Sequence, residues 1–388
     1  MTRILWHGIA PWQPTGYGQQ TAIWASRIRD AGYELAVSAQ GGASTCEVTN
    51  WRGIPVFPSA NNQEAVPLVS RYHLDWFKPD LVITLYDGWQ MIGEVFKGYK
   101  TLAWLPVDTT YVTVGSLRPG GVAAGDRKFL EKAEAIPVAM SRHGQAQLAQ
   151  AGYPDCAYVP HGIDTRNEWA PLDNRQELRS QIGIGPDTFA VGICGTNIDP
   201  HRKSMSEQFL AFSRFHVEHP DSVLLVHSSI HEPGSLHLDR LASGCGIPQD
   251  KIRIAHQAAL YTGTFPQSDL RAWYSCLDVL MGASHGEGFG LTALEAQACG
   301  TPVILIDQHT GPELVGPGWL VESQPFWNWT HEAWWHVPLI DSLTGALEKA
   351  FASAGSQREA ARDFAEDFDT RRVWPSWEAI LREHAPPP

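Results

Sequence analysis

The chain has 388 residues, which at roughly 100–200 residues per domain predicts two domains. Hydrophobic residues make up 43% of the sequence and charged residues 18%, with 35 Gly and 27 Pro, and this composition excludes fibrous, coiled-coil and disordered proteins. The 29 Lys and Arg against 42 Asp and Glu give a formal charge of −13, which argues against a protein built to follow nucleic acid or an anionic membrane.

The first part of the chain predicts a parallel sheet with helices between its strands. An apolar run at 3–7, a loop rich in Pro and Gly, and apolar residues at helical spacing in 19–31 form the start of a βαβ unit. Gly32 ends that helix. Further strands are expected at 34–39, 81–85, 101–105 and 135–139.

A second series of strands and helices predicts a second α/β domain. Its strands are expected at 189–194, 223–227, 252–255, 279–281 and 303–306. We predict an N-terminal domain at 1–165, a second domain at 166–365, and a C-terminal helix at 366–388 that crosses back to the first domain.

Cysteines and hydropathy predict the compartment. The six cysteines lie far apart without a CxxC pair, so we expect reduced residues in the core. The N-terminus lacks the apolar stretch of a secretory signal, and no run of about 18 apolar residues predicts a membrane-spanning helix. We therefore expect a cytoplasmic protein.

The segment at 284–303, SHGEGFGLTALEAQACGTPV, carries the strongest functional signal. Gly286, Gly288 and Gly290 let the backbone approach a ligand closely, directly before a predicted helix. The N–H groups and the positive dipole end of that helix favour an anion. Gly300 ends the helix. The segment therefore predicts a site for a ligand that carries phosphate.

Two carboxylates belong to this segment, Glu287 on the loop and Glu295 inside the helix. At 1.5 Å per helical residue they lie about 8–12 Å apart. This separation suits two polar parts of one extended ligand and is long for the carboxylate pairs that cleave glycosides, which are about 5–9.5 Å apart. The structural alternative is that Glu287 makes a loop hydrogen bond and Glu295 is a solvated helix residue.

The same segment resembles the signature of family 4 glycosyltransferases, in which two Glu are separated by seven residues. Asp278 and Ser284 before the loop and Gly311-Pro312-Glu313 after it are also similar to that family. The resemblance implies an α/β protein with the GT-B fold, two Rossmann-like parallel-sheet domains that face each other across a cleft. It also implies a transferase that uses a nucleoside diphosphate sugar and retains the configuration at the anomeric carbon.

The resemblance assigns roles to the glycine loop. It implies that Glu287 contacts hydroxyls of the donor sugar and that Glu295 holds the ribose diol. The backbone of the loop and of the helix start would then face the diphosphate at Gly288, Phe289, Gly290 and Leu291.

The leaving diphosphate needs positive charge in the transition state. The family supplies it from an Arg and from a Lys five residues later, without a metal. Lys203 is similar to the family Lys, whereas Ile198 occupies the position of the Arg. Arg202 is the candidate for the second charge, although neighbouring residues on a helix point about 100° apart. The structural alternative is that both are solvated cations at a helix start.

No metal site and no cofactor are predicted. No Asp-x-Asp follows a strand, and His216-x-x-His219 before Pro220 is interpreted as a helix end. The nucleotide sugar would act as a co-substrate.

The first domain offers residues for the acceptor side. Thr21 replaces the last Gly of a dinucleotide fingerprint, which argues against a nicotinamide dehydrogenase. The loop around Gly16 and Gly18 instead resembles the glycine loop at the start of family 4 chains, near the donor phosphate. The structural alternative is that Gly16 and Gly18 only form a tight turn.

Two acids follow strands of the first domain. Asp108 stands where many family members have His-Asp, with Val107 in place of the His, and the resemblance implies that it positions the acceptor hydroxyl. Asp87 is a second candidate, and helix capping is the structural alternative for each. His161-Gly-Ile-Asp164 resembles the family's hinge motif. The Trp-rich stretch at 319–335 is interpreted as structural.

The sequence therefore predicts a metal-independent glycosyltransferase that uses a UDP- or GDP-sugar. The acceptor stays open among small molecules, glycans, lipids and, despite the charge, a DNA base. The alternatives are an epimerase or hydrolase of the same fold and a sugar-nucleotide-binding protein without catalytic activity.

Overall fold

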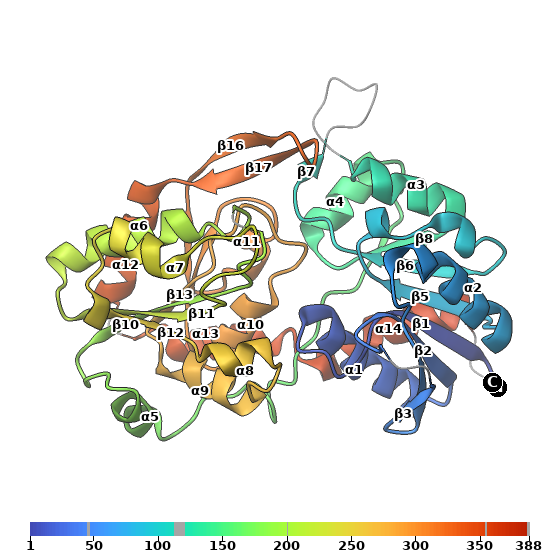
Figure 1. The fold of residues 1–388 in the computed structure, drawn as a ribbon, viewed down its shortest axis with the longest axis horizontal. Helices are drawn as coiled ribbons and strands as arrows, with labels where there is room; N and C mark the ends of the chain where they lie inside the picture. Colours follow the sequence, from blue (N-terminus) through green and yellow to red (C-terminus); the bar gives the residue numbers. More distant parts are fainter. Residues whose placement is uncertain (45–46, 112–120, 200, 354, 386–388) are drawn as a thin grey trace. The chain divides into compact units, whose positions relative to one another are not determined.

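The computed structural model describes residues 1–44, 47–111, 121–199, 201–353 and 355–385. The chain divides into two compact units (Figure 1). Unit 1 consists of Met1–Gly162, Trp329–Ala333 and Val373–Pro388, and unit 2 of Ile163–Asn328 and Trp334–Arg372. Each unit is built around one sheet that is largely parallel.

The sheet of unit 1 has eight strands in the order β3-β4-β2-β1-β5-β6-β8-β9. All its pairings are parallel except that between β3 and β4. The strands are β1 (Arg3–Ile9), β2 (Glu34–Gly41), β3 (Thr49–Trp51), β4 (Ile54–Phe57), β5 (Leu81–Leu85), β6 (Thr101–Leu105), β8 (Ile136–Ala139) and β9 (Ala157–Tyr158). The short strand β7 (Thr110–Tyr111) follows β6. The helices are α1 (Gly16–Asp30), α2 (Val66–Phe77), α3 (Ala124–Ala133) and α4 (Arg142–Gln150), with 3-10 turns at Gln63–Ala65, Gly88–Gln90 and Gly93–Val95.

Helices cover both faces of this sheet, and successive side chains of β1 contact helices on opposite faces. Trp6 donates from its indole Nε1 to Thr21 Oγ1 of α1 at 3.0 Å. The next residue, His7, points to the other face and shares the Ser38 hydroxyl with His73 of α2, at 3.0 Å from each ring. Because both faces are buried, the central strands are almost continuously apolar.

The C-terminal helix α14 (Thr370–His384) contributes to the core of unit 1. The Trp377 ring lies 5.9 Å from Trp6, 6.0 Å from Trp24 and 5.0 Å from Trp104, between ring centroids. All four indoles are fully buried. At its end, the Ala385 carbonyl accepts a hydrogen bond from the Tyr33 hydroxyl at 3.0 Å. The core of unit 1 is therefore completed by residues 373–385.

The sheet of unit 2 has six parallel strands in the order β12-β11-β10-β13-β14-β15. They are β10 (Phe189–Cys194), β11 (Ser222–His227), β12 (Ile252–Ile254), β13 (Val279–Met281), β14 (Val303–Ile306) and β15 (Trp319–Val321), followed by β16 (Ser323–Asn328) and β17 (Ala333–Pro338). The longer helices are α6 (Met205–Glu218), α9 (Gln267–Cys276), α10 (Leu291–Ala298), α12 (Ile340–Ala352) and α13 (Arg358–Glu366). The shorter ones are α5 (Arg175–Gln181), α7 (Leu238–Gly244), α8 (Gln257–Tyr261) and α11 (Gly311–Leu314), with a 3-10 turn at Gln249–Lys251.

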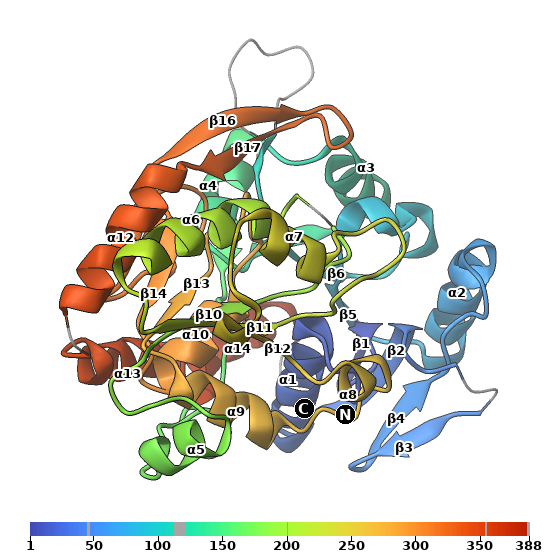
Figure 2. The ribbon, with the colours of Figure 1, turned by 60° about the vertical axis from the view of Figure 1, so that its left-hand side comes forward.

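Figure 2 shows α6, α7 and α12 over one face of this sheet and α9, α10 and α13 below the other. Phe209, Phe212 and Phe215 of α6 and Leu343 and Leu347 of α12 form one buried cluster with the strands.

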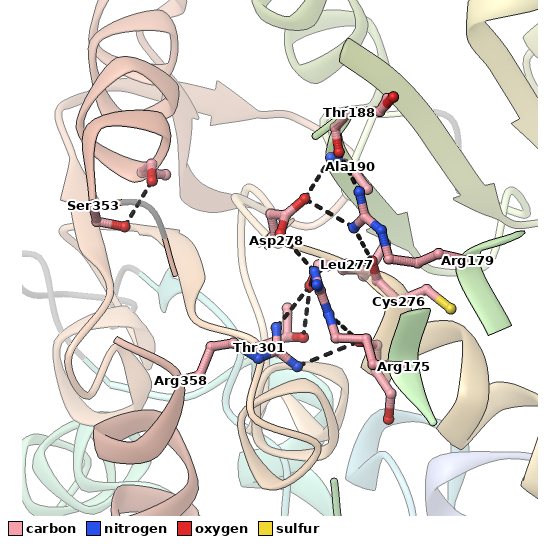
Figure 3. A network of polar contacts seen from close by, with 12 residues as sticks. Arg175, Arg179, Thr188, Ala190, Cys276, Leu277, Asp278, Thr301, Ser353 and Arg358 are labelled. Atoms are coloured by element: carbon pink, nitrogen blue, oxygen red, sulfur yellow. Dashed lines mark hydrogen bonds and ion pairs between the residues drawn. The ribbon is translucent and has the colours of Figure 1, made fainter. Parts of the chain in front are cut away.

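An arginine network joins the start of unit 2 to its sheet (Figure 3). Asp278, directly before β13, pairs with Arg175 at 2.6 Å and Arg179 at 3.1 Å, and accepts from the Ala190 amide of β10 at 2.8 Å. Arg358 of α13 donates to the Leu277 carbonyl at 2.9 Å. The arginines thus bind the last carbonyls of α9, which have no partner inside the helix.

The structure confirms the predicted strands. Those expected at 81–85, 101–105, 189–194, 279–281 and 303–306 have the predicted bounds. The short strands β3, β4 and β9 were not predicted, because two to four residues are too few to show the pattern of a strand. The cysteines of the described residues form no disulfide, and Cys46 lies outside those residues.

Candidate functional site

The candidate site lies at the carboxyl edge of the unit 2 sheet, where β10 and β13 are neighbours. β11 and β12 lie on the other side of β10, so the strand order reverses between β10 and β13. In open parallel sheets, the loops that leave such a switch point diverge and form a binding crevice. The loop after β10 carries Arg202 and Lys203, and the loop after β13 carries Glu287.

Lys203 and Arg202 both bind Glu287. The Lys203 ammonium pairs with Oε1 of Glu287, and Arg202 Nη1 lies 3.3 Å from Oε2. We expected adjacent residues to point apart, but they lie in a turn before α6, which begins at Met205. The His285 amide donates to the Arg202 carbonyl at 2.7 Å and fixes the two loops to each other.

The pKa values of both Glu287 and Lys203 are lowered in this group. Burial raises the pKa of Glu287, but the charges of Lys203 and Arg202 and hydrogen bonds from Lys203 and Ser284 outweigh it and lower the pKa to about 2. Burial and the charge of Arg202 lower the pKa of Lys203, against the opposing effect of Glu287. Two cations against one carboxylate leave a net positive charge for an incoming anion.

The glycine loop ends at the start of α10. Gly290 is the residue before the helix and has a φ of +116°, a backbone conformation that residues with a side chain rarely adopt. Leu291 is the first helical residue, and Phe289 is buried against Phe368, with 5.9 Å between ring centroids. The first N–H groups of a helix have no partner inside it. With Gly288 they form a backbone surface next to the cations of the neighbouring loop.

Glu295 lies on α10 and is 93% buried. It accepts a hydrogen bond from a tyrosine, whereas Glu287 pairs with the two cations. The buried Tyr274 hydroxyl of α9 donates to Glu295 Oε2 at 3.0 Å. The same hydroxyl lies 3.3 Å from the Cys194 sulfur at the end of β10. Glu295 is therefore not a solvated helix residue, because its carboxylate is fixed from another helix.

A recess beside Glu287 opens between β13, β14 and α10. Its polar lining includes Ser284, Glu287, Gln308, His309 and Thr310. Its volume is about 20 Å³, room for about one water-sized group. The enclosed part of the recess therefore has room for a group the size of a hydroxyl.

In unit 1, Gly16 and Gly18 lie in the first turn of α1. Gly16 is exposed, whereas the Gly18 amide donates to the Thr15 side chain at 3.1 Å. A Cβ at Gly18 would lie 2.3 Å from the Gln13 carbonyl oxygen. Gly18 is thus required by the close approach of the chain, and its N–H already has an acceptor.

The acidic candidates of unit 1 lie near a third acid, Asp126 of α3. Asp87 accepts from the Tyr17 hydroxyl at 3.0 Å, and Asp108 from the Tyr111 hydroxyl at 3.1 Å. Burial, together with the charges of Asp87 and Asp108, raises the pKa of Asp126 to about 8, although the Trp89 amide donates to it. Asp126 is therefore protonated at neutral pH.

Tyr274, Asp126 and His309 were not among the predicted site residues. The Tyr274 hydroxyl binds Glu295, 21 residues further along the chain, and Asp126 accepts from the amide of Trp89, 37 residues before it, so no local sequence pattern predicts either contact. No three or more His, Cys, Asp or Glu side chains of the described chain are grouped as metal ligands. Within the same residues, no helix is long and apolar enough to cross a bilayer.

Comparison with known proteins confirms the resemblance. Residues 228–328 match the family described as glycosyl transferases group 1, and this segment contains Glu287 and Glu295. A D-inositol 3-phosphate glycosyltransferase of Streptomyces bingchenggensis is 30% identical over 176 residues, which are 42% of this chain and 36% of that protein. The chain spans less than half the length of the first relatives that it matches.

Solved structures confirm the predicted GT-B fold. Sucrose-phosphate synthase from Thermosynechococcus elongatus superimposes with a TM-score of 0.73 at 16% identity, over 99% of both chains. The Anabaena protein HepE in complex with UDP-glucose gives a TM-score of 0.71 at 16% identity, over 98% of this chain and 99% of HepE.

Proposed function

We propose that this chain is a glycosyltransferase that takes a sugar from a nucleoside diphosphate donor. The observation that carries the proposal is the group formed by Lys203, Arg202 and Glu287 at the switch point of the unit 2 sheet. Two cations next to the N-terminus of α10 suit a diphosphate, and a carboxylate between them and the recess suits the hydroxyls of the attached sugar. The family match over residues 228–328 supports this assignment.

The sheet order supports a direction for the donor. Glu295 and Tyr274 lie at the end of β10 beside Cys194, Lys203 and Arg202 follow β10, and Glu287 follows β13. The recess lies one strand further, at β14. We therefore place the ribose at Glu295, the diphosphate between β10 and α10, and the sugar between β13 and β14.

The reaction follows from these positions. The bond between the anomeric carbon and the diphosphate oxygen breaks, and Lys203 and Arg202 stabilise the charge that develops on the leaving diphosphate. The acceptor hydroxyl forms its bond to the anomeric carbon on the face that the diphosphate leaves, and its proton passes to a phosphate oxygen. The configuration is thereby retained, and the two side-chain cations supply the charge without a metal.

Unit 1 supplies the candidates for the acceptor. Asp108 and Asp87 accept hydrogen bonds from tyrosine hydroxyls, and we propose that Asp108 orients the acceptor hydroxyl. The donor is a UDP- or GDP-sugar in this proposal, and HepE, which has a similar fold, is described in complex with UDP-glucose.

A thermal-shift screen with UDP-, GDP- and ADP-sugars tests the donor class. A ligand that binds only the folded chain raises the melting temperature, so we expect one nucleotide series to raise it and the others not. K203A should reduce the shift, whereas K251A, which changes a cation before the start of β12, should not. No shift with any nucleotide sugar would contradict the proposal.

Product analysis then separates transfer from its alternatives. The bound donor is incubated with pools of glycans, lipids, small metabolites and DNA, and the products are identified by mass spectrometry. A glycosylated acceptor supports transfer. Free sugar alone indicates a hydrolase, an epimeric sugar an epimerase, and binding without turnover in any pool a sugar-nucleotide-binding protein.

A further inference from the structure

His309 has a backbone conformation that its place in the fold does not explain. Its φ is +54°, in the left-handed region that disfavours residues with a side chain. Lys78 and Glu134 share this conformation, but each caps the C-terminus of a helix, where it is common. His309 caps no helix end, because it lies between β14 and the residue before α11.

The loop around His309 is tightly held. A Cβ at Gly311 would lie 1.8 Å from the Ile306 carbonyl oxygen, so only glycine fits there. The Gly311 amide donates to the Gln308 carbonyl at 3.0 Å, and the buried Thr310 lies between. A glycine at position 309 would adopt the same backbone without strain, and yet the chain has a histidine.

His309 is one of the residues that line the recess beside Glu287. Of the described residues other than glycine with a positive φ, His309 is the one that lines this recess. Its ring lies edge-on to the ring of His336, with 5.2 Å between centroids. The His336 amide donates to the His285 carbonyl at 3.2 Å, so the packing that holds His309 continues to the loop of Glu287.

The order of the strands fixes the part of the donor that His309 would meet. The cations follow β10, Glu287 follows β13, and His309 follows β14 at the next position along the same edge. His309 therefore lies on the side of Glu287 that is away from the cations, where the sugar ring of the donor would extend.

We propose that His309 is the residue that selects the donor sugar, through contacts of its imidazole with ring hydroxyls on the side away from the diphosphate. This inference rests on the proposed function. An imidazole nitrogen can donate to or accept from a hydroxyl, and the enclosed part of the recess has room for a group of that size. The strained backbone is retained because it presents the ring to the recess.

The test compares three variants with the wild type by calorimetry. H309G removes the imidazole and the strain, and H309N keeps a short polar side chain that tolerates the same backbone. E134G is the matched control, because Glu134 has a φ of +53° at an exposed helix end in unit 1. The probes are UDP, UDP-glucose and its C4 epimer UDP-galactose, or GDP, GDP-mannose and its C2 epimer GDP-glucose if the protein binds GDP.

We expect a wild-type protein that binds one epimer more tightly than the other. H309G should bind the bare nucleotide within about twofold of wild type and should reduce the ratio of the two donor affinities by roughly three- to tenfold. The ratio of the two donor affinities in H309N should lie between those of the wild type and H309G, and E134G should keep the wild-type ratio. Relief of strain should raise the melting temperature of H309G and of E134G by about 2 °C.

The outcomes separate the two proposals. An unchanged ratio in H309G, or a wild-type protein that binds both epimers equally, would contradict the role of His309 while the donor class stands. If H309G is too unstable to measure, the same comparison is made with H309N. A wild-type protein that binds no nucleotide at all would overturn the proposed function and this inference with it.

Discussion

Lys203 and Glu287 are 84 residues apart in the chain and form an ion pair at the ends of adjacent strands, with side chains that are 13% and 23% exposed. The pair brings the loop after β10 and the loop after β13 into one site. In the proposed function, a diphosphate that binds there would compete with Glu287 for Lys203.

Replacing Glu287 by Gln should separate catalysis from binding. We expect turnover to fall by about 100-fold or more, because in the proposed function Glu287 is the charge that would contact the reacting sugar. Affinity for the nucleoside diphosphate should not fall, since Lys203 and Arg202 are no longer neutralised. Steady-state rates and calorimetry measure the two effects, and near-normal turnover would remove Glu287 from the donor site.

The pH dependence of stability provides a control on the same variant. The pKa of Glu287 is about 2 in the folded chain and 4.5 in its ordinary state, so its ion pairs stabilise the fold above about pH 4.5. That contribution is lost as the pH falls toward 2. The melting temperature of E287Q should therefore depend less on pH between about 5 and 3 than that of the wild type.

The two cations should differ in their effect on phosphate binding. K203A should weaken binding of the nucleoside diphosphate by about 10- to 100-fold and leave binding of the bare nucleoside unchanged. Because Arg202 is also engaged with the Gly286 carbonyl at 3.4 Å, R202A should have a smaller effect. Equal affinity of K203A and wild type for the diphosphate would place the phosphate elsewhere.

Tyr274 should control recognition of the ribose. Y274F removes the hydroxyl that holds Glu295 and keeps the buried ring, so we expect the affinity for UDP or GDP to fall by about three- to tenfold. The preference for a nucleotide over its 2′-deoxy analogue should fall as well. Y261F is the control, since the exposed Tyr261 hydroxyl donates to the His231 carbonyl. An unchanged preference in Y274F would separate Glu295 from the ribose.

Asp126 should make unit 1 less stable in alkali. Its pKa is about 8 in the folded chain and 3.8 in its ordinary state, so between these values the folded state holds a proton that the unfolded state releases. Stability therefore falls as the pH rises toward 8. The free energy of unfolding of D126N should rise relative to that of the wild type as the pH increases, by about 4 kcal/mol between pH 5 and pH 9. Urea unfolding at about pH 5 and pH 9 measures it, and a constant difference would contradict the prediction.

Asp278 should contribute strongly to the stability of unit 2. D278A leaves the Arg179 guanidinium, whose side chain is 1% exposed, without its carboxylate, and should cost about 3–5 kcal/mol in urea unfolding. D341A, in the exposed pair of Arg214 and Asp341, is the control and should cost less than about 1 kcal/mol. Similar losses in the two variants would show that the network in Figure 3 adds little.

The sequence was sufficient for the central strands of both sheets and for the glycine loop. Strands buried on both faces are continuous apolar runs, and the loop from Gly286 to Gly290 requires residue types that mark it. Both features are local, so a pattern of neighbouring residues predicts them.

The rest depends on side chains that meet only in the fold. The Tyr274 hydroxyl reaches Glu295 from another helix, and the raised pKa of Asp126 requires acids at the ends of two other strands. That Lys203 and Arg202 both pair with Glu287 was not predicted either. The two cations were expected on a helix, where neighbouring side chains point apart, but they lie in a turn.

The three indoles around Trp377 have a consequence for synthesis on the ribosome. Trp6, Trp24 and Trp104 emerge early, but the ring that fills the space between them comes from residue 377. The core of the half that is translated first is therefore completed only after nearly all of unit 2 has been synthesised.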